Sequence, residues 1–493
     1  MPRWTIKPGI AVGLLATIAA VALGLVVTGR GTGISTTPAT PADQFDPDTP
    51  NVVVVMTDDQ AIDTMRAMPR TRRLLGAKGV TFDNAFVSYP LCCPSRASFQ
   101  TGQYAHNHGV LDNHPPNGGY QAFDTKRALP VWLSDAGYRT GFVGKYLNGY
   151  GKGKAATEVP PGWSDWYGLP ASAKQRPFGF ELNENGELVS YDDGEYKTGV
   201  LEDKAVSLLR DWDRDDRPFF LWVATDAPHK DAGADEKADR DPEPAPRDRG
   251  RFEREKAPRG ESFNESDVSD KPGIVKGKRR LNKSEHAQID KIYRSQLESL
   301  IAVDRLVKSI VRELRRRGEL ENTVVMFTSD NGFIRGQHRI ESGKASLYDE
   351  AIRVPLLVRG PGFPVGERDE RVVGNVDLAP TILDLAAARA DIDPDGVSLL
   401  PFEARRDGWR PNLLLEVLER DKGNFVGVRT PRFAYAEYAK ENMHGEGKRE
   451  LYDLYRDPKQ LDNVAGDPGY ADEVARLEAR VAELRECAGA ECR

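Results

Sequence analysis

The chain has 493 residues, with 69 Lys plus Arg against 76 Asp plus Glu and a formal net charge of −7. This length predicts about two to four structural units, whose buried core needs no disulfide framework. Four cysteines in such a length also exclude a disulfide-dense scaffold. The slightly acidic balance argues against a general nucleic-acid binder, because such proteins carry a basic surface. An enzyme-sized globular body remains.

The first thirty residues have the features of a targeting segment. Arg3 and Lys7 precede an almost uncharged run at residues 9–28. A basic flank before an apolar stretch is typical of a secretory signal or of an uncleaved signal anchor, and this run is long enough to span a bilayer as a helix. We therefore expect residues 1–30 to direct export, residues 31–49 to form a linker, and the body to be secreted or anchored to the outer face of the membrane by this segment alone.

Export bears on the last two cysteines of the chain. In an oxidising compartment, Cys487 and Cys492 can close a small disulfide loop at the C-terminus. The alternative is two unpaired thiols in a frayed tail. The sequence leaves both open.

Four apolar runs predict strands that are buried on both faces of a parallel sheet. They lie at residues 51–57, 139–144, 218–225 and 323–329. Helical patterns lie between them, the clearest at residues 288–317, where apolar residues recur on one face and Gly318 follows as a C-cap. The alternation of strands and helices predicts a doubly wound α/β sheet with helices on both faces.

The C-terminal part follows a different pattern. Strand-like pieces at residues 425–429 and 433–438 precede an amphipathic helix near residues 470–485. We expect a catalytic domain at residues 50–400 and a smaller α+β subdomain at residues 401–493.

A long charged and Pro-rich stretch interrupts the alternating pattern at residues 231–283. It has no sustained periodicity, which predicts a surface insertion after a strand. Two interpretations stay open: a solvated loop, or a flap that faces the substrate.

Polar residues follow each of the four predicted strands. They are Asp58 and Asp59 after the first, Lys145 after the second, His229 after the third, and Asp330 and Asn331 after the fourth. In open α/β sheets the ligand crevice lies outside the carboxyl ends of the strands, so we expect these groups to converge. Three carboxylates and an amide oxygen favour Ca²⁺ or Mg²⁺ over zinc. Each piece alone also occurs as a turn or a helix cap, and only the convergence predicts a site.

The run Cys92-Cys93-Pro94-Ser95-Arg96 predicts the start of a helix, because Pro94 suits its first turn. Cys92 would then lie at a helix N-terminus, which favours anions. Two other interpretations are a buried small hydrophobic residue and a thiolate nucleophile of lowered pKa. Neither explains why ligands of a hard cation should gather around a soft sulfur atom.

Cys92-x-Pro94-Ser95-Arg96, followed by residues 97–102, resembles the signature of type I sulfatases. Further matches lie at residues 55–60, 144–148, 227–229, 329–332, 343–348, 353–356 and 450–454, with Asp457, Pro458 and Asn463. The resemblance covers roughly residues 50–466. Residues 104–108 and 262–272 are similar to the N-acetylglucosamine-6-sulfatase and heparan endosulfatase branch of that family.

The resemblance implies an alkaline-phosphatase-like fold and a modified nucleophile. In the family, the cysteine at the position of Cys92 is oxidised after translation to formylglycine by a maturation enzyme. Its aldehyde hydrates to a geminal diol, so the metal meets an oxygen instead of a thiolate. By the same resemblance, Asp58, Asp59, Asp330, Asn331 and the modified Cys92 hold one divalent cation, usually calcium.

The resemblance also implies how the reaction proceeds. The cation and Arg96 lower the cost of a diol alkoxide, which attacks the sulfur. Lys145, His229 and Lys344 bind sulfate oxygens and offset the charge that develops, and His229 or Lys344 protonates the leaving alcohol. A base then removes the second hydroxyl proton, which expels sulfate and restores the aldehyde.

Two positions depart from the family pattern. Leu147 stands where many sulfatases have a histidine, which leaves the second-step base open between His338 and Asp330. Lys230 follows His229 where a shorter apolar residue is commoner, and we expect it to reshape the rim of the site.

His106 and His108 lie close in sequence to the Cys92 motif. We expect them to be structural or rim residues, because a hard cation prefers oxygen ligands.

These residues predict an exported sulfuric ester hydrolase that acts on a sulfated sugar or an aryl sulfate. Two alternatives stay open. A metal-bound diol can also attack phosphorus, which would make the chain a phosphonate or phosphate monoester hydrolase on the same fold. The third possibility is a non-catalytic binder of sulfated glycans, but a binder has no need for an oxidisable cysteine.

Overall fold

The structure is a computed structural model that describes residues 49–493, except 172–175, 214, 233–238, 407, 419–423 and 440–448. The expected targeting segment at residues 1–30 lies outside the described residues, and so does the expected linker apart from Thr49. In the described part of the chain, no helix combines the length and apolarity that crossing a membrane requires.

The described residues form helices and strands in alternation, followed by a run of strands. The helices are α1 Pro69–Leu74, α2 Cys92–Thr101, α3 Ala105–His108, α4 Leu129–Asp135, α5 Lys197–Asp211, α6 Gly273–Lys276, α7 Lys283–Arg317, α8 Asp349–Ile352, α9 Leu378–Leu385 and α10 Ala471–Leu484. The strands are β1 Asn51–Thr57, β2 Val80–Phe86, β3 Arg139–Gly144, β4 Asp165–Gly168, β5 Phe180–Glu184, β6 Glu187–Tyr191, β7 Phe219–Ala224, β8 Asp231–Ala232, β9 Asp239–Arg240, β10 Thr323–Ser329, β11 Leu356–Arg359, β12 Glu367–Gly374, β13 Leu413–Val417, β14 Phe425–Arg429, β15 Phe433–Tyr438 and β16 Arg449–Asp453.

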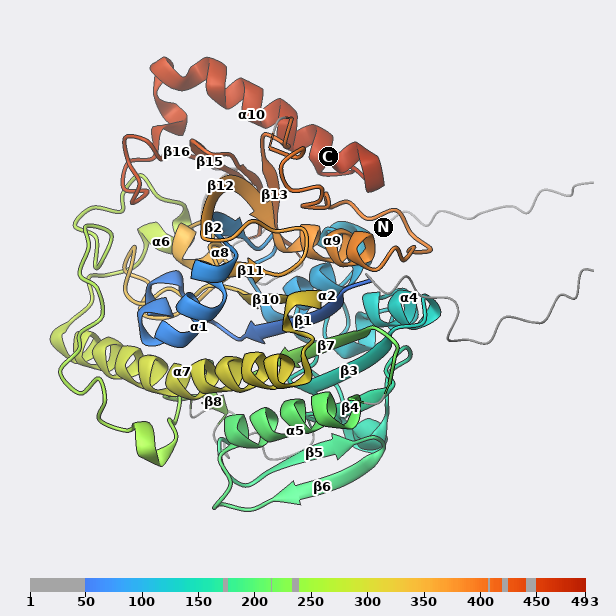
Figure 1. The fold of residues 1–493 in the computed structure, drawn as a ribbon. Helices are drawn as coiled ribbons and strands as arrows, with labels where there is room; N and C mark the ends of the chain where they lie inside the picture. The colour runs from blue at the N-terminus through green and yellow to red at the C-terminus, as the bar shows by residue number, and fades with distance from the viewer. Residues whose placement is uncertain are drawn as a thin grey trace, which may run out of the picture. The chain divides into compact units, whose positions relative to one another are not determined.

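A ten-stranded sheet in the order β12-β2-β11-β10-β1-β7-β3-β4-β5-β6 runs through the centre of the protein (Figure 1). β1 pairs in parallel with β10 and β7, and β7 pairs in parallel with β3. These four strands are the apolar runs that the sequence predicted, because a strand covered on both faces has no polar side. The predicted α/β class, with a smaller C-terminal subdomain, is confirmed.

The outer strands make the sheet mixed. β11 runs antiparallel between β10 and β2, and β5 runs antiparallel to both β4 and β6. β11 has only four residues and β6 is mostly exposed. Such short or one-sided strands carry no long apolar run, so the sequence did not predict them.

The two faces of the sheet pack on different helices, as the alternation of side chains along β1 shows. Val53 and Val55 belong to the apolar cluster that contains the buried sides of α5 and α7. Val52 and Val54 belong to the cluster that contains α2, α4 and α9. Successive side chains of a strand point to opposite faces, so β1 is buried by both helix layers.

The long helix α7 is held by caps at both ends. It begins at Lys283 instead of the predicted residue 288, because the Asn282 side chain accepts hydrogen bonds from the backbone N–H groups of Ser284 (2.9 Å) and Glu285 (3.1 Å). The Glu285 carboxylate in turn accepts from the Asn282 N–H (2.7 Å), which completes a capping box. Gly318 ends the helix with a φ of 78°, as predicted for the C-cap.

The C-terminal strands β13 to β16 form a separate antiparallel sheet, against which α10 packs through β14. β14 and β15 have the predicted bounds, and α10 begins and ends within one residue of its predicted helix.

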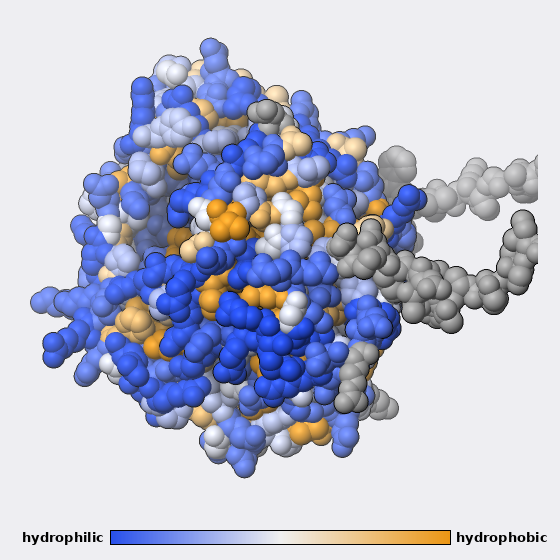
Figure 2. Space-filling view, in the orientation of Figure 1, coloured by the Kyte–Doolittle hydropathy of each residue, from blue (hydrophilic) through white to orange (hydrophobic). Residues whose placement is uncertain are grey.

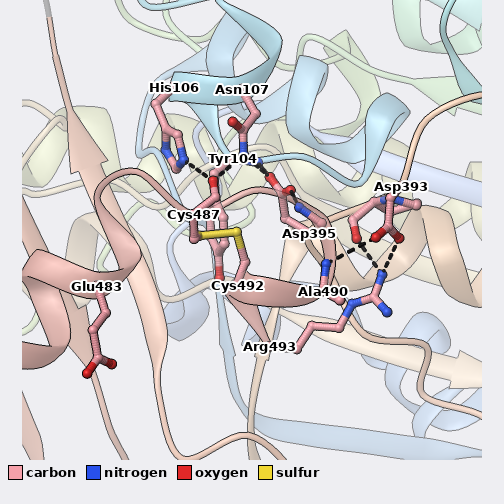
Figure 3. Close-up of a disulfide and its surroundings, with 12 residues drawn as sticks. Tyr104, His106, Asn107, Asp393, Asp395, Glu483, Cys487, Ala490, Cys492 and Arg493 are labelled. Atoms are coloured by element: carbon pink, nitrogen blue, oxygen red, sulfur yellow. Dashed lines mark hydrogen bonds and ion pairs between the residues drawn. A yellow bond between two sulfur atoms is a disulfide. The ribbon is translucent and has the colours of Figure 1, made fainter.

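The chain ends in a disulfide between Cys487 and Cys492, which decides between the two possibilities that the sequence left open (Figure 3). The Cys487 carbonyl accepts hydrogen bonds from His106 Nε2 and Asn107 Nδ2, both at 2.9 Å. Asp395 accepts from the Gly489 N–H at 2.7 Å. The disulfide loop is therefore fastened to the segment that follows α2.

The apolar face of α7 allows a test of this packing. Leu300 is fully buried in the α7 cluster, so we expect Leu300→Ala to lower the free energy of unfolding by about 2–5 kcal/mol. Arg312→Ala, on the exposed side of the same helix, should change it by less than about 0.5 kcal/mol. Equal losses in urea unfolding would contradict the burial of this helix face.

Candidate active site

The polar groups predicted to converge do lie together at one edge of the sheet. β1 lies between β10 and β7 with all three strands parallel, so the residues that follow them emerge on the same side. The Asp330 N–H donates to the Thr57 carbonyl (3.0 Å), and the Asp59 N–H donates to Asp330 Oδ1 (3.2 Å). The two acidic strand ends are thus joined directly.

Cys92 begins α2, and all ten residues of this helix are buried. The Cys93 N–H at this helix start donates to Asn113 Oδ1 (2.9 Å). Cys92 Sγ lies 3.6 Å from Asp58 Oδ1, 2.8 Å from Lys344 Nζ and 4.0 Å from Lys145 Nζ. The helix therefore places the sulfur atom among both signs of charge.

Arg96 lies one helical turn after Cys92 and is completely buried between two carboxylates. Its Nη2 donates to Asp58 (3.0 Å) and its Nε donates to Asp330 (2.8 Å), while Nη1 donates to the Lys145 carbonyl (2.5 Å). A guanidinium has five donors in a fixed fork, which suits it to bridge several acceptors. Arg96 ties the acidic strand ends of β1 and β10 to the segment that follows β3.

Asp59 gathers the remaining predicted residues. Its carboxylate accepts from Lys344 Nζ (2.5 Å) and Asn331 Nδ2 (2.6 Å), and it lies 3.5 Å from His229 Nε2. Lys145 forms a close ion pair with Asp58. The structure therefore brings all nine predicted site residues into one continuous set of contacts.

The exposed fractions of the cations show from which side a substrate can approach. The side chain of His229 is 35% exposed, whereas those of Lys145 and Lys344 are 16% and 15% exposed and Arg96 is at zero. The site is open at His229 and closed at Arg96. A ligand anion can therefore contact His229, Lys145 and Lys344, whereas Arg96 lies on the buried side of the site.

The electrostatics of the site argue against a simple cysteine nucleophile. Burial raises the pKa of the Cys92 thiol to about 12, and the charge of Asp58 adds to the rise. An unmodified Cys92 is therefore a neutral thiol at pH 7, in spite of its place at a helix N-terminus. The predicted alternative of a thiolate with a lowered pKa does not fit.

The two acids that flank Arg96 respond to their surroundings in opposite ways. Burial by itself would raise the pKa of Asp58, but Lys145 and the other nearby cations outweigh it and hold this pKa well below its usual range. Burial and the negative charge of Asp58 raise the pKa of Asp330. The raised pKa of Asp330 shows that the negative charges of these carboxylates are not fully compensated, so a further positive charge can be stabilised beside them.

The donor set fits a hard divalent cation. Ligand atoms of Asp58, Asp59, Cys92 and His229 lie within 4.8 Å of one another. Asn331 Oδ1 is buried and has no hydrogen-bond partner among the described residues, an arrangement that is costly unless a cation or a water meets the oxygen. Carboxylate and amide oxygens are the ligands that Ca²⁺ and Mg²⁺ prefer. The sulfur atom of unmodified Cys92 and the ring nitrogen of His229 match such a cation less well.

Of the two predicted second-step bases, only Asp330 borders the site. His338 is fully buried, and its Nδ1 lies 2.7 Å from the Glu265 carboxylate. Its ring stacks on the Tyr348 ring, with the two ring centres 3.8 Å apart. Within the described residues, no contact joins His338 to Cys92.

His106 and His108 have structural contacts, as predicted. His106 Nδ1 lies 2.7 Å from Glu416, and its other nitrogen binds the C-terminal disulfide loop (Figure 3). His108 Nε2 lies 3.0 Å from Ser98 Oγ, and burial lowers the pKa of His108 to about 3. His108 therefore contacts α2 through Ser98, whereas His106 links β13 to the C-terminal disulfide loop.

Sequence reasoning missed the support of His229. Lys197, at the start of α5, is buried and forms an ion pair with the partly exposed Asp226, whose carbonyl accepts the His229 N–H at 2.8 Å. Asp226 lies three residues before His229, and this spacing in the sequence could have indicated that Asp226 contacts His229. Its partner comes from a helix whose approach only the tertiary structure reveals.

The Lys197–Asp226 pair is testable through stability. The Lys197 side chain is 3% exposed and that of Asp226 is 22% exposed, so we expect Lys197→Met to lower the free energy of unfolding by about 3 kcal/mol. Lys204 on the same helix pairs with Glu184 at 25% and 17% exposure, and Lys204→Met should cost less than about 1 kcal/mol. Chemical denaturation measures both, and equal losses would contradict a special role for Lys197.

Comparison with known proteins agrees with this geometry. A family model described as "Sulfatase" matches residues 50–388, and one described as "N-sulphoglucosamine sulphohydrolase, C-terminal" matches residues 336–487. The chain is 34% identical to human N-acetylglucosamine-6-sulfatase over 494 aligned residues, which cover 90% of this chain and 86% of the relative.

Two solved structures share the fold. One is BT4656 in complex with its substrate D-glucosamine-2-N,6-O-disulfate (TM-score 0.73, 24% identity, 89% of this chain and 98% of that chain). The other is the phosphonate monoester hydrolase of Agrobacterium radiobacter (TM-score 0.66, 23% identity, 88% and 95%). With the matched family and the relative at 34% identity, the chain belongs to the sulfatase family and is a sulfuric ester hydrolase.

Proposed function

We propose that the chain removes a sulfate ester from a sulfated amino sugar of the N-acetylglucosamine-6-sulfate type, with Cys92 oxidised to formylglycine. The observation that carries this proposal is the surrounding of Cys92. A buried sulfur atom that touches Lys344 and lies near Asp58 is not activated as a thiolate. Its position suits an oxygen nucleophile, which the hydrate of formylglycine supplies.

Asp58, Asp59, Asp330 and Asn331, with the modified Cys92, would hold one Ca²⁺. This ion would supply positive charge to stabilise an oxygen anion at position 92. The unpartnered Asn331 Oδ1 supports this assignment.

The chain's own cations have distinct roles in the proposed reaction. Lys145 and Lys344, which approach Cys92 from two sides, bind sulfate oxygens and offset the charge that develops on them. His229 is the most exposed of these cations, so it meets the leaving oxygen and donates a proton to the alcohol. Arg96 keeps Asp58 and Asp330 in place from the buried side.

A phosphonate or phosphate monoester hydrolase is the second candidate, because the shared fold with such an enzyme supports it. The sequence supports sulfate more strongly, since the relative at 34% identity is a sulfatase. A non-catalytic glycan binder is the weakest candidate, because binding alone requires neither Cys92 nor the buried Arg96.

We also propose that residues 1–30 direct export, that a formylglycine-generating enzyme acts on this chain, and that residues 50–400 and 401–493 are the catalytic domain and the C-terminal subdomain. The disulfide at the C-terminus supports export.

The role of Cys92 is tested by comparing it with its neighbour. We expect Cys92→Ala to lower kcat/KM for 4-methylumbelliferyl N-acetylglucosamine-6-sulfate by more than about 1,000-fold, because it removes the nucleophile. Cys93 is equally buried, and the kcat/KM of Cys93→Ala should stay within about tenfold of that of the unchanged protein.

Peptide mass spectrometry of the active protein should show formylglycine at position 92. The corresponding phosphate ester, assayed in parallel, should be the poorer substrate. An unmodified thiol in active protein would refute the mechanism, and a higher kcat/KM for the phosphate ester would favour the second candidate.

The cation is tested by its effect on stability as well as on activity. At 100 times its Kd, bound Ca²⁺ should stabilise the folded protein by about 2.7 kcal/mol, and EDTA should remove that gain together with the activity. Ca²⁺ should raise the Tm of the unchanged protein, and Asp59→Asn should abolish most of this rise. Asp63→Asn is the matched control, because Asp63 pairs with Arg335 outside the site. A full Ca²⁺ response in Asp59→Asn would exclude the proposed ligand set.

A further inference from the structure

The chain between α6 and α7 displays a cluster of positive charge, which we name the basic segment (residues 276–283). Its sequence is Lys-Gly-Lys-Arg-Arg-Leu-Asn-Lys, and it contains no acidic residue. All five cations, Lys276, Lys278, Arg279, Arg280 and Lys283, are exposed. Because the whole chain carries a net charge of −7, this is a local concentration of charge and not part of a generally basic surface.

Most of this charge has no partner within the described part of the chain. Arg279 pairs with Glu285 at 2.7 Å, and the nearby negative charge of Glu341 also raises the pKa of Arg279. Lys276, Lys278, Arg280 and Lys283 form no ion pair among the described residues. The edge of the molecule where α7 begins is covered by hydrophilic residues (Figure 2).

The backbone of the basic segment is held in a defined shape. Leu281 is buried, its N–H donates to Asn264 Oδ1 (2.7 Å), and its carbonyl accepts from Asn264 Nδ2 (3.1 Å). Asn282 then caps α7. Lys283 is the first residue of α7, where a positive charge opposes the helix dipole. The fold therefore anchors the segment but does not itself need these cations.

The basic segment borders the loop that carries Lys344. Arg339 in that loop donates to the Lys278 carbonyl (3.0 Å) and to the Glu265 carbonyl (2.8 Å). The same loop is closed by the pairing of Ile334 with Gly343, the residue before Lys344. The basic segment is therefore in contact with the loop that carries Lys344 through Arg339.

We propose that the basic segment is a second binding surface for a sulfated polysaccharide, which holds further anionic groups of the chain whose sulfate ester enters the site. This inference rests on the proposed function. Exposed cations in a row bind a polyanion by releasing its counterions, which makes the affinity strongly salt-dependent. The contact with the loop of Lys344 favours a sulfated glycan over a nucleic acid, and in this proposal the basic segment at the end of the insertion faces the substrate.

The test uses two triple variants of equal charge change. In Lys276→Ser/Lys278→Ser/Arg280→Ser, three cations of the basic segment are removed. In Lys308→Ser/Arg312→Ser/Arg315→Ser, three exposed cations near the other end of α7 are removed, about 38 Å along the helix axis from Lys283 to Lys308 at roughly 1.5 Å per residue. Both variants spare Arg279 and the capping box.

Heparin is the probe, and its Kd is measured by fluorescence titration at several salt concentrations. We expect the basic-segment variant to bind heparin at least about tenfold more weakly and with a smaller slope of log Kd against log salt. The ratio of kcat/KM for a heparin oligosaccharide to that for 4-methylumbelliferyl sulfate should fall by a similar factor. The α7 variant should match the unchanged protein in both measurements.

Equal losses in both variants would overturn the proposal, because they would show only a general charge effect. The proposal would also be overturned if a single-stranded DNA of equal charge bound the unchanged protein as tightly as heparin and lost the same affinity in the basic-segment variant. Heparin binding does not require turnover, so it can be measured with Cys92 unmodified. Failure of the proposed function would abolish activity without changing heparin affinity, and the two failures are thus distinguishable.

Discussion

The structure depends on the burial of three carboxylates at the ends of two neighbouring parallel strands. Asp58, Asp59 and Asp330 are between 0% and 3% exposed, and a buried charge costs several kcal/mol unless it is paired. The basic side chains that lie against them are Arg96, Lys145, His229 and Lys344, each from a different segment. Four distant parts of the chain must therefore meet at this edge of the sheet before the charges balance.

The same balance explains why the site can act on an anion. Arg96 is fully buried and bonded to two carboxylates and to the backbone after β3, whereas Lys145, Lys344 and His229 each keep part of their surface exposed. In the proposed mechanism these side chains are held by the buried acids and therefore stay directed at an entering sulfate group. Such fixed charges stabilise a transition state without having to reorganise.

Two further parts of the chain pack around this centre. The C-terminal sheet and its disulfide loop reach back to His106 and Asn107 just after α2. The insertion before α7 brings the basic segment to the loop of Lys344. A shared fold does not decide the substrate, and the proposed second binding surface lies on one of these segments.

The sequence by itself determined the central strands and the helix that begins at Cys92, because continuous apolar runs and a dense motif are local signals. With the family resemblance it also named the nine residues that lie together at the candidate site. It did not determine the mixed edges of the sheet, since short strands depend on partners distant in the chain. The start of α7 at Lys283 depends on a capping box between Asn282 and Glu285, and the disulfide joins cysteines five residues apart; the apolar pattern marks neither of these short-range contacts. Only the tertiary structure showed that Lys197 supports His229 through Asp226. An ion pair between residues of separate elements leaves no periodic pattern in a sequence.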